Sequence, residues 1–297
     1  MVRMAVSGRE GQVVRSLVER ASGSDVEIVA LGRPELDLAG PADAIIAAIE
    51  DAQPQIIVSA AAFTQVDRAE GERELAFAVN EQGPRAVARA ARNLGVPLIH
   101  LSTDYVFDGS KTSPYVEEDE THPTGIYGAS KLAGEQAVLE EHADTAVLRT
   151  AWVYSPFGSN FVRTMMRLAG DRSEICVVAD QRGNPSSALD IADGVLRAAA
   201  NLRSSNDPKC RGVFHMTGAG EASWAEFAEA IFAASGEAGG PTARVKHIRT
   251  ADYPTPARRP ANSRLNSAKL ASTHNVRLPD WRSSLKLVVT RLLENGA

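Results

Sequence analysis

Cysteine is scarce in this chain, which has only Cys176 and Cys210 among 297 residues. Two isolated cysteines provide neither a disulfide framework nor a metal-binding spacing, so we expect buried thiols in a reducing compartment. Long apolar runs are also missing, and none approaches the roughly 20 residues that a membrane span requires. The first residues lack the apolar core and cleavage pattern of a signal peptide. These absences predict a cytoplasmic protein without a membrane partner.

An excess of basic residues is absent as well. The chain has 32 Lys and Arg against 37 Asp and Glu, a formal net charge of −5, which gives no support to a nucleic-acid partner. Hydrophobic residues make up 44% and charged residues 23%, an ordinary globular composition. A chain of this length can form one large domain or two modest ones. We therefore expect a globular protein that acts on a small molecule.

Short apolar runs alternate with helical stretches in the first half. Strands are expected at residues 2–7, 26–31, 56–61, 97–103 and 146–154, and helices at residues 11–20, 41–51, 72–94 and 126–141. Such alternation predicts an α/β fold, a Rossmann-like doubly wound parallel sheet with helices on both faces. Ligands of such folds bind at the carboxyl ends of the strands.

The second half is less regular and predicts a smaller α/β substrate domain. Helices are expected at residues 160–169, 190–202, 223–234 and 280–294, a strand at residues 212–217, and an ordered loop at residues 251–264. Ser223 followed by Glu226 predicts a capping box. We expect a discontinuous boundary between the domains. Residues 1–154 and 186–217 would bind the cofactor, and residues 155–185 and 218–297 would hold the substrate.

A glycine turn follows the first strand. Gly8 and Gly11, with Gln12 and Val13 after them, would let a pyrophosphate approach backbone N–H groups at a helix N-terminus. The third glycine of the usual dinucleotide pattern is replaced by Val14. A glycine pair on its own is equally compatible with a plain turn, but its position after the first strand of a βαβ unit favours a dinucleotide site.

The second strand is followed by Arg33, where an arginine can accept the 2′-phosphate of NADPH. A solvated arginine is the alternative interpretation. The residue thus favours NADPH over NADH without deciding between them.

Tyr127 and Lys131 are four residues apart in an expected helix, which brings both side chains onto one face. An ammonium beside a tyrosine favours the phenolate and would lower a pKa that is ordinarily about 10. Tyr127 could then give its proton to a carbonyl oxygen as hydride reaches the carbon. Lys131 would hold the nicotinamide ribose.

Ser102 and Thr103 close the fourth expected strand, near the same edge of the sheet. A hydroxyl there can polarise a substrate carbonyl, and we assign this role to Thr103. A turn or helix-cap hydroxyl is the alternative. A glycine turn, this hydroxyl and the Tyr127–Lys131 pair occur together by chance much more rarely than each motif occurs alone.

The order of these motifs resembles the extended short-chain dehydrogenase/reductases. Four runs are similar to those of dTDP-4-dehydrorhamnose reductases in particular: HLSTDYVFDG at residues 100–109, YGASKLAGE at 127–135, RTAWVY at 149–154 and YPTPARRPANSRL at 253–265. The resemblance covers nearly the whole chain. It implies reduction of a nucleotide-linked 4-keto sugar by NADPH or NADH, with Thr103, Tyr127 and Lys131 as the catalytic residues. Members of the family can be homodimeric and stimulated by Mg²⁺, for which no ligands can be assigned.

The resemblance also completes the expected binding residues. It places Asp37 and Leu38 against the adenine. The cofactor residues are then Gly8, Gly11, Gln12, Val13, Arg33, Asp37, Leu38, Ala62, Phe63, Thr64, Tyr127 and Lys131. The sugar-nucleotide residues are Thr103, Asp104, Trp152, Arg258 and Arg259. The two arginines are candidates for the substrate pyrophosphate, the alternative being that one of them pairs with a local carboxylate.

Two other functions remain open at this stage. The first is a non-catalytic NADP-binding regulatory subunit, similar to the beta subunit of methionine adenosyltransferase. The second is another nucleotide-sugar enzyme, such as a dehydratase or a GDP-sugar epimerase-reductase. Dehydratases follow the threonine with Asp-Glu, whereas Tyr105 follows Asp104 here, so elimination lacks its base. The presence of Thr103, Tyr127 and Lys131 together favours an enzyme over a regulatory subunit.

Overall fold

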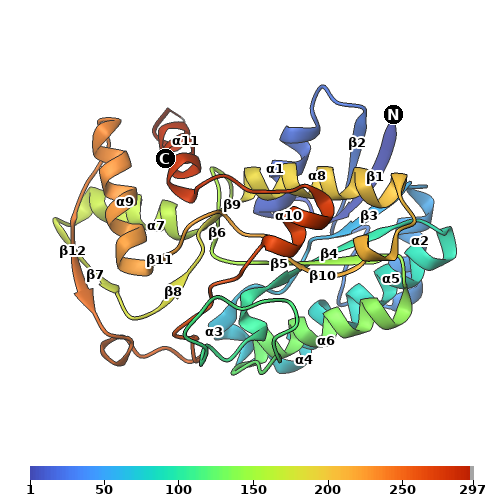
Figure 1. Cartoon of the computed structure of the whole chain (residues 1–297), viewed down its shortest axis with the longest axis horizontal. Helices are drawn as coiled ribbons and strands as arrows, with labels where there is room; N and C mark the ends of the chain where they lie inside the picture. Colours follow the sequence, from blue (N-terminus) through green and yellow to red (C-terminus); the bar gives the residue numbers. More distant parts are fainter. Residues whose placement is uncertain (295–297) are drawn as a thin grey trace.

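A six-stranded parallel sheet forms the centre of the computed structural model, which describes residues 1–294 (Figure 1). The strand order is β2-β1-β3-β4-β5-β10, and every neighbouring pair is parallel. The strands are β1 (Val2–Ser7), β2 (Val26–Leu31), β3 (Ile56–Ser59), β4 (Leu98–Thr103), β5 (Thr145–Thr150) and β10 (Gly212–His215). The predicted Rossmann-like α/β fold is therefore confirmed.

Helices cover both faces of this sheet (Figure 1). One face is covered by α1 (Gln12–Ala21) and α8 (Ala188–Ser204), and the other by α2 (Ala42–Asp51), α5 (Gly83–Leu94) and α6 (Ile126–Glu141). β4 and β5 are buried at every position, which explains why their sequences are nearly continuous apolar runs. Each fully buried Leu, Ile or Val in these two layers contributes about 1.5–3 kcal/mol through the hydrophobic effect.

The second half forms a separate apolar core around Phe227 and Trp281, on the left of Figure 1. Three helices surround it, α7 (Phe161–Asp171), α9 (Trp224–Glu237) and α11 (Trp281–Glu294). The capping box predicted at Ser223 and Glu226 is present at the start of α9. A parallel pair, β7 (Glu174–Val178) and β12 (Arg244–Ile248), completes this part and was not predicted.

Short elements connect these layers. The helical ones are α3 (Val66–Ala69), α4 (Arg73–Phe77), η1 (Ala78–Gln82), η2 (Asp104–Val106), η3 (Pro208–Cys210), η4 (Thr250–Asp252) and α10 (Ala268–His274). The strands are β6 (Val153–Tyr154), β8 (Arg182–Gly183), β9 (Ser186–Ser187) and β11 (Ala222–Ser223).

Two predicted elements are wrong in detail. The strand expected over residues 146–154 breaks after β5, because Trp152 has φ +48° and the chain turns into β6, which pairs with β9. The helix expected over residues 72–94 contains the wider turn η1 between α4 and α5. Wider turns of this kind are frequent at functional sites, and this one carries the buried side chain of Asn80.

The strand order reverses between β1 and β3, which lie side by side with β2 beyond β1. Such a reversal opens a crevice at the carboxyl ends of the strands, where α/β proteins bind ligands. Gly8 follows β1 at this edge, Ala61 follows β3, and Thr103 ends β4. The sheet topology therefore brings the predicted motifs to one side of the molecule.

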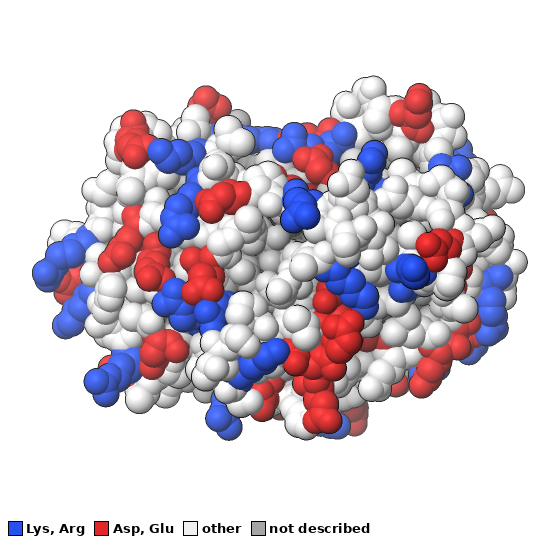
Figure 2. Space-filling model, in the orientation of Figure 1, with Lys and Arg blue, Asp and Glu red and all other residues white. Residues whose placement is uncertain are grey.

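The surface carries Lys and Arg interspersed with Asp and Glu over the face seen in Figure 2. No helix within residues 1–294 is long and apolar enough to span a bilayer.

Candidate active site

The turn after β1 brings the backbone unusually close to its neighbours. Gly8 has φ +104°, and a Cβ atom there would lie 3.3 Å from Val14 Cγ2 and 3.4 Å from Ala61 Cβ. Val14, which replaces the expected third glycine, is buried against this turn. No side chain caps α1 at Gly11, so the first N–H groups of the helix are open to an anion.

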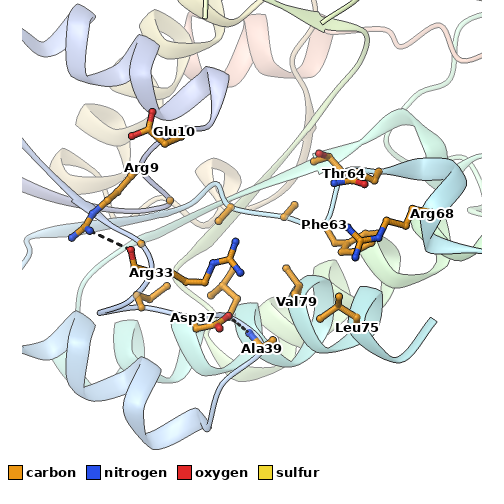
Figure 3. A pocket seen from close by; sticks show the side chains of 17 residues that line it. Arg9, Glu10, Arg33, Asp37, Ala39, Phe63, Thr64, Arg68, Leu75 and Val79 are labelled. Atoms are coloured by element: carbon orange, nitrogen blue, oxygen red, sulfur yellow. Dashed lines mark hydrogen bonds between the residues drawn. The ribbon is translucent and has the colours of Figure 1, made fainter. Parts of the chain in front are cut away.

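A cavity of about 810 Å³ opens beside this turn (Figure 3). It brings together seven of the predicted cofactor residues, Gly8, Arg33, Asp37, Leu38, Ala62, Phe63 and Thr64. Its other lining residues were not predicted: Arg9, Glu10, Gly32, Leu36, Ala39, Ala61, Gln65, Arg68, Leu75 and Val79. A volume in this range suits a small organic ligand.

Gln12, another predicted cofactor residue, points toward the second half of the chain. Its Oε1 accepts hydrogen bonds from Ser155 Oγ at 2.9 Å and from Asn160 Nδ2 at 3.0 Å. Val13 is half-buried against the core beneath the sheet. Gln12 therefore ties the glycine turn to the segment that leads into α7.

Arg9 and Arg33 lie at the end of the cavity near β2 (Figure 3). The guanidinium of Arg9 pairs with Glu35 at 2.8 Å and donates to the Arg33 carbonyl at 3.3 Å. Arg33 is exposed, and its side chain reaches into the cavity beside Asp37 (Figure 3). Arg9 was missed from the sequence, although its place inside the glycine turn was a usable signal.

Asn80 fixes the loop that follows β3. Its Oδ1 accepts from the Phe63 amide at 2.8 Å, and its Nδ2 donates to the Phe63 carbonyl at 3.1 Å and to Ser130 Oγ at 3.0 Å. Ser130 lies on α6 between Tyr127 and Lys131. One buried amide thus links the cofactor loop to the helix of the predicted catalytic pair, a link that no sequence spacing revealed.

Tyr127 lies in the first turn of α6, half-buried, with its ring edge-on to Tyr105 at 5.5 Å between centroids. Burial raises the pKa of its phenol above the ordinary value, and a hydrogen bond with the Thr103 side chain opposes this rise. The prediction that Lys131 lowers this pKa is therefore wrong for the protein alone. Tyr127 therefore keeps its phenolic proton at neutral pH, which leaves that proton available for donation.

Lys131 lies on the same face of α6, only 3% exposed. Its Nζ donates to the Leu101 carbonyl at 2.7 Å and lies 3.4 Å from His100 Nε2. Burial lowers the pKa of its ammonium to about 8, against the opposing charge of Glu135. Lys131 is thus anchored to β4 and stays largely charged at pH 7.

Thr103 and Asp104 are buried at the end of β4. Thr103 Oγ1 donates to Asp104 Oδ1 at 3.0 Å and accepts from the Tyr105 amide at 3.2 Å. The hydroxyl of Thr103 therefore caps the turn, as the alternative interpretation proposed. It also hydrogen-bonds to the Tyr127 side chain. Burial raises the pKa of Asp104 to about 6, and Asp104 Oδ2 has no hydrogen-bond partner within residues 1–294.

Trp152, a predicted substrate residue, is half-buried and stacks on Trp224 with ring centroids 3.6 Å apart. Trp281 by contrast is buried in the core of the second half. The stack joins the segment after β5 to the start of α9, so residues from both halves of the chain pack together here.

The two arginines of the C-terminal loop differ. Arg259 forms an ion pair with Asp67 at 2.9 Å. This is the pairing with a local carboxylate that was the alternative to binding the substrate pyrophosphate. Arg258 is exposed and makes no hydrogen bond or ion pair with the residues that the structure describes. Arg259 is thus fixed by Asp67 near Tyr105, and Arg258 is available to an anion.

Comparisons with known proteins agree over the full length. Residues 2–294 match the family model described as the RmlD substrate binding domain. A dTDP-4-dehydrorhamnose reductase from Sinorhizobium fredii is 52% identical over 295 residues, 99% of each chain. One from Burkholderia thailandensis is 44% identical over 98% of this chain and 99% of its own. The chain belongs to the dTDP-4-dehydrorhamnose reductase family.

Solved structures of the family share this fold. The reductase from Clostridium acetobutylicum superposes with a TM-score of 0.91 at 34% identity, over 98% of this chain and 99% of its own. The reductase from Bacillus anthracis, solved in complex with NADP, gives a TM-score of 0.88 at 34% identity, over 97% of this chain and 98% of its own.

The residues present fit a dinucleotide of this kind. The turn at Gly8 has φ +104° and little room for a Cβ, the N-terminus of α1 is uncapped, and the cavity beside them is large enough for a nucleotide. A metal site has no comparable basis, because no group of three or more His, Cys, Asp or Glu within residues 1–294 is arranged to hold an ion. The Mg²⁺ considered from the family resemblance therefore stays unassigned.

Proposed function

We propose that this chain reduces the 4-keto group of dTDP-4-dehydro-L-rhamnose to give dTDP-L-rhamnose, the last step of dTDP-rhamnose synthesis. The observation that carries the proposal is the hydrogen bond between the side chains of Tyr127 and Thr103 at the end of β4, with Lys131 one turn further along α6. Asn80 joins this helix to the Phe63 loop, which lines the cavity that fits NADPH. The family membership and the NADP complex of a relative support the same reaction.

NADPH, or NADH in its place, supplies the hydride that adds to the carbonyl carbon. Thr103 Oγ1, whose hydrogen points to Asp104 Oδ1 in the protein alone, would turn this hydrogen to the carbonyl oxygen and polarise it. Tyr127 transfers its phenolic proton to that oxygen, so the ketone becomes an alcohol. The charge of Lys131 stabilises the phenolate left behind, which burial otherwise disfavours.

The cofactor would be held along the cavity from the turn at Gly8 to the loop at Phe63. The N-terminus of α1, at Gly11, Gln12 and Val13, would face the pyrophosphate. Arg33, assisted by Arg9, would bind the 2′-phosphate. Asp37 and Leu38 would lie against the adenine, and Ala62, Phe63 and Thr64 against the middle of the molecule.

The sugar nucleotide would bind between the two halves. Asp104 and Trp152 would contact the sugar, and Arg258 the pyrophosphate, with Arg259 held nearby by Asp67. In this proposal residues 1–154 and 186–217 form the cofactor domain, and residues 155–185 and 218–297 the sugar-nucleotide domain. A cytoplasmic location and a homodimer remain proposals from the family resemblance.

The test is the loss of absorbance at the reduced-nicotinamide band when purified protein meets NADPH and a dTDP-4-keto sugar generated in situ. We expect loss of absorbance that depends on the dTDP sugar and is far slower with a GDP-4-keto sugar. Cofactor binding without turnover on the dTDP sugar would contradict the proposal and favour a regulatory subunit. Turnover only on the GDP sugar would contradict the substrate assignment.

A further inference from the structure

His100 is a completely buried histidine in the middle of β4, with 0% of its surface exposed. Neither the sequence motifs nor the proposed reaction gives it a role. Both of its ring nitrogens nevertheless face polar groups of the site. Nε2 lies 3.4 Å from Lys131 Nζ, and Nδ1 lies 3.1 Å from Ser59 Oγ at the end of β3.

The protonation of this ring follows from its neighbours. Burial and the adjacent ammonium of Lys131 hold the pKa of His100 well below its ordinary value, so the ring is neutral at pH 7. A neutral imidazole has one donor and one acceptor nitrogen. A hydrogen on Nε2 would point a donor at a cation that is itself only a donor. The hydrogen therefore belongs on Nδ1, which donates to Ser59 Oγ.

We propose that His100 is a positioning residue for Lys131, and that its unprotonated Nε2 accepts one N–H of the ammonium. The Leu101 carbonyl accepts a second N–H at 2.7 Å. An ammonium has three N–H groups, so one remains for the cofactor ribose. β4 thus fixes the direction of the remaining donor through two successive residues.

The close packing of α6 on β4 supports this role. Gly134 lies one turn beyond Ser130, and a Cβ there would lie 2.0 Å from the Asn80 carbonyl oxygen and 3.6 Å from His100 Nε2. Only a glycine at this position lets α6 approach Asn80 so closely, and the His100 ring lies at ordinary contact distance from the same point of the helix.

The other charged groups near Lys131 do not replace this contact. Within residues 1–294, Glu135 of α6 is the carboxylate that acts on the Lys131 charge. Arg149 of β5 binds the Glu135 carboxylate in a bidentate ion pair, with Nε donating to Oε1 at 2.9 Å and Nη2 donating to Oε2 at 2.7 Å. Its charge is thus largely compensated, and it does not touch the ammonium. Within residues 1–294, His100 Nε2 and the Leu101 carbonyl are the hydrogen-bond partners of Lys131 Nζ.

The first experiment reads the tautomer in the protein without cofactor or sugar. The chain has only six histidines, so the ring nitrogens of His100 can be assigned in a ¹⁵N-histidine NMR spectrum. We expect a protonated Nδ1 and a pyridine-type Nε2 from pH 6 to 8. A protonated Nε2 in this range would overturn the proposal.

The second experiment reads Lys131 itself in three proteins, the wild type, His100→Leu and His100→Gln. The chain has six lysines, so the ¹³Cε signal of Lys131 can be followed against pH. Loss of the acceptor in His100→Leu should lower the pKa of Lys131 by about half a unit to one unit. Gln offers a carbonyl oxygen near the position of Nε2, so His100→Gln should restore most of the pKa. An unchanged pKa in a folded His100→Leu, or no rescue by Gln, contradicts the proposal.

Steady-state kinetics then test the role in the reaction. The alkaline limb of kcat/KM should shift to lower pH in His100→Leu and return in His100→Gln. The KM for NADPH should rise about 10-fold in His100→Leu, since the direction of the third N–H is lost. His142→Gln is the matched control, because His142 caps the far end of α6 and its ring hydrogen-bonds to the Val96 carbonyl at 2.9 Å, away from Lys131. A loss of kcat with an unshifted pH profile would instead mark His100 as a packing residue.

This inference rests on the proposed assignment of Lys131 to the cofactor, but the two can fail separately. The NMR measurements need neither cofactor nor sugar nucleotide, so they decide the His100 contact even if the reductase assay is negative. A positive assay with a protonated Nε2 would reject the contact and leave the proposed function standing.

Discussion

The indole rings of Trp152 and Trp224 are almost parallel, with an interplanar angle of 5° and 3.6 Å between their centroids. Trp152 reaches this position with φ +48°, in a region that bulky residues rarely occupy. Gly183 makes the arrangement possible, since a Cβ there would lie 2.4 Å from the Trp152 ring. Residues from three separate segments therefore fix the side chain of Trp152, which we propose contacts the sugar.

Gly183→Ala should displace Trp152 and lower kcat/KM for the sugar nucleotide by about 10–100-fold, because small misplacements near the reacting atoms are costly. The Kd of NADPH should stay unchanged, since the cavity lies on the other side of β4. Steady-state kinetics with a fluorescence titration of NADPH test both parts. Gly170→Ala is the control, as nothing lies within 4 Å of a Cβ at that position. Equal kinetics in the two variants would show that Trp152 does not shape the sugar site.

Tyr127→Phe should lower kcat by about 10²–10⁴-fold, the usual contribution of a positioned proton donor. Cofactor binding should remain nearly intact, because only one hydroxyl is removed and the ring still packs on Tyr105. Single-turnover kinetics and NADPH fluorescence provide the measurements. Near-normal turnover in the variant would be incompatible with the assigned role.

Arg33→Ala should raise the KM for NADPH at least 10-fold while leaving the KM for NADH within about twofold, since only NADPH carries the 2′-phosphate. Arg9→Ala should act in the same direction but less, because Arg9 is already paired with Glu35. Parallel titrations with both nucleotides measure the difference. Equal effects on the two cofactors would show that the 2′-phosphate does not bind at this end of the cavity.

Asp104→Asn should change the pH dependence of stability. Burial raises the pKa of Asp104 from 3.8 to about 6, so the folded protein binds the proton more tightly than the unfolded chain. Wild-type stability should therefore fall as pH rises from about 4 to 6, by on the order of 1–3 kcal/mol relative to the variant, which cannot ionise. Urea unfolding at pH 4, 5, 6 and 7 provides the comparison. A constant difference between the two proteins across this range would mean that Asp104 titrates normally.

Much of the fold could be predicted because its patterns are local. The apolar runs of β1, β2 and β4 and the turn at Gly8 are contiguous in sequence, and the spacing of Tyr127 and Lys131 is fixed by helix geometry. The edge of the sheet where the motifs meet follows from the parallel order of the strands.

The parts that escaped prediction depend on contacts between distant segments. β7 and β12 are five-residue strands that pair across some 70 residues of sequence, a contact that no local pattern reveals. Cys176 in β7 is exposed, so the expectation of a buried thiol is wrong there and holds for Cys210. Asn80 and His100 look ordinary in sequence, and only tertiary packing brings them against α6. The prediction for the pKa of Tyr127 failed because burial, which spacing does not reveal, raises it, while the Lys131 ammonium is bound to the Leu101 carbonyl.

The most direct test of the account follows the transferred hydrogen. Wild-type protein would be given the dTDP-4-keto sugar and NADPH carrying deuterium at the reactive carbon, and the sugar-nucleotide product analysed by mass spectrometry and NMR. The account predicts one deuterium at C4 of the product sugar, and none above background with Tyr127→Phe over the same time. A product without deuterium, or with deuterium at another carbon, would contradict hydride transfer to the 4-keto group.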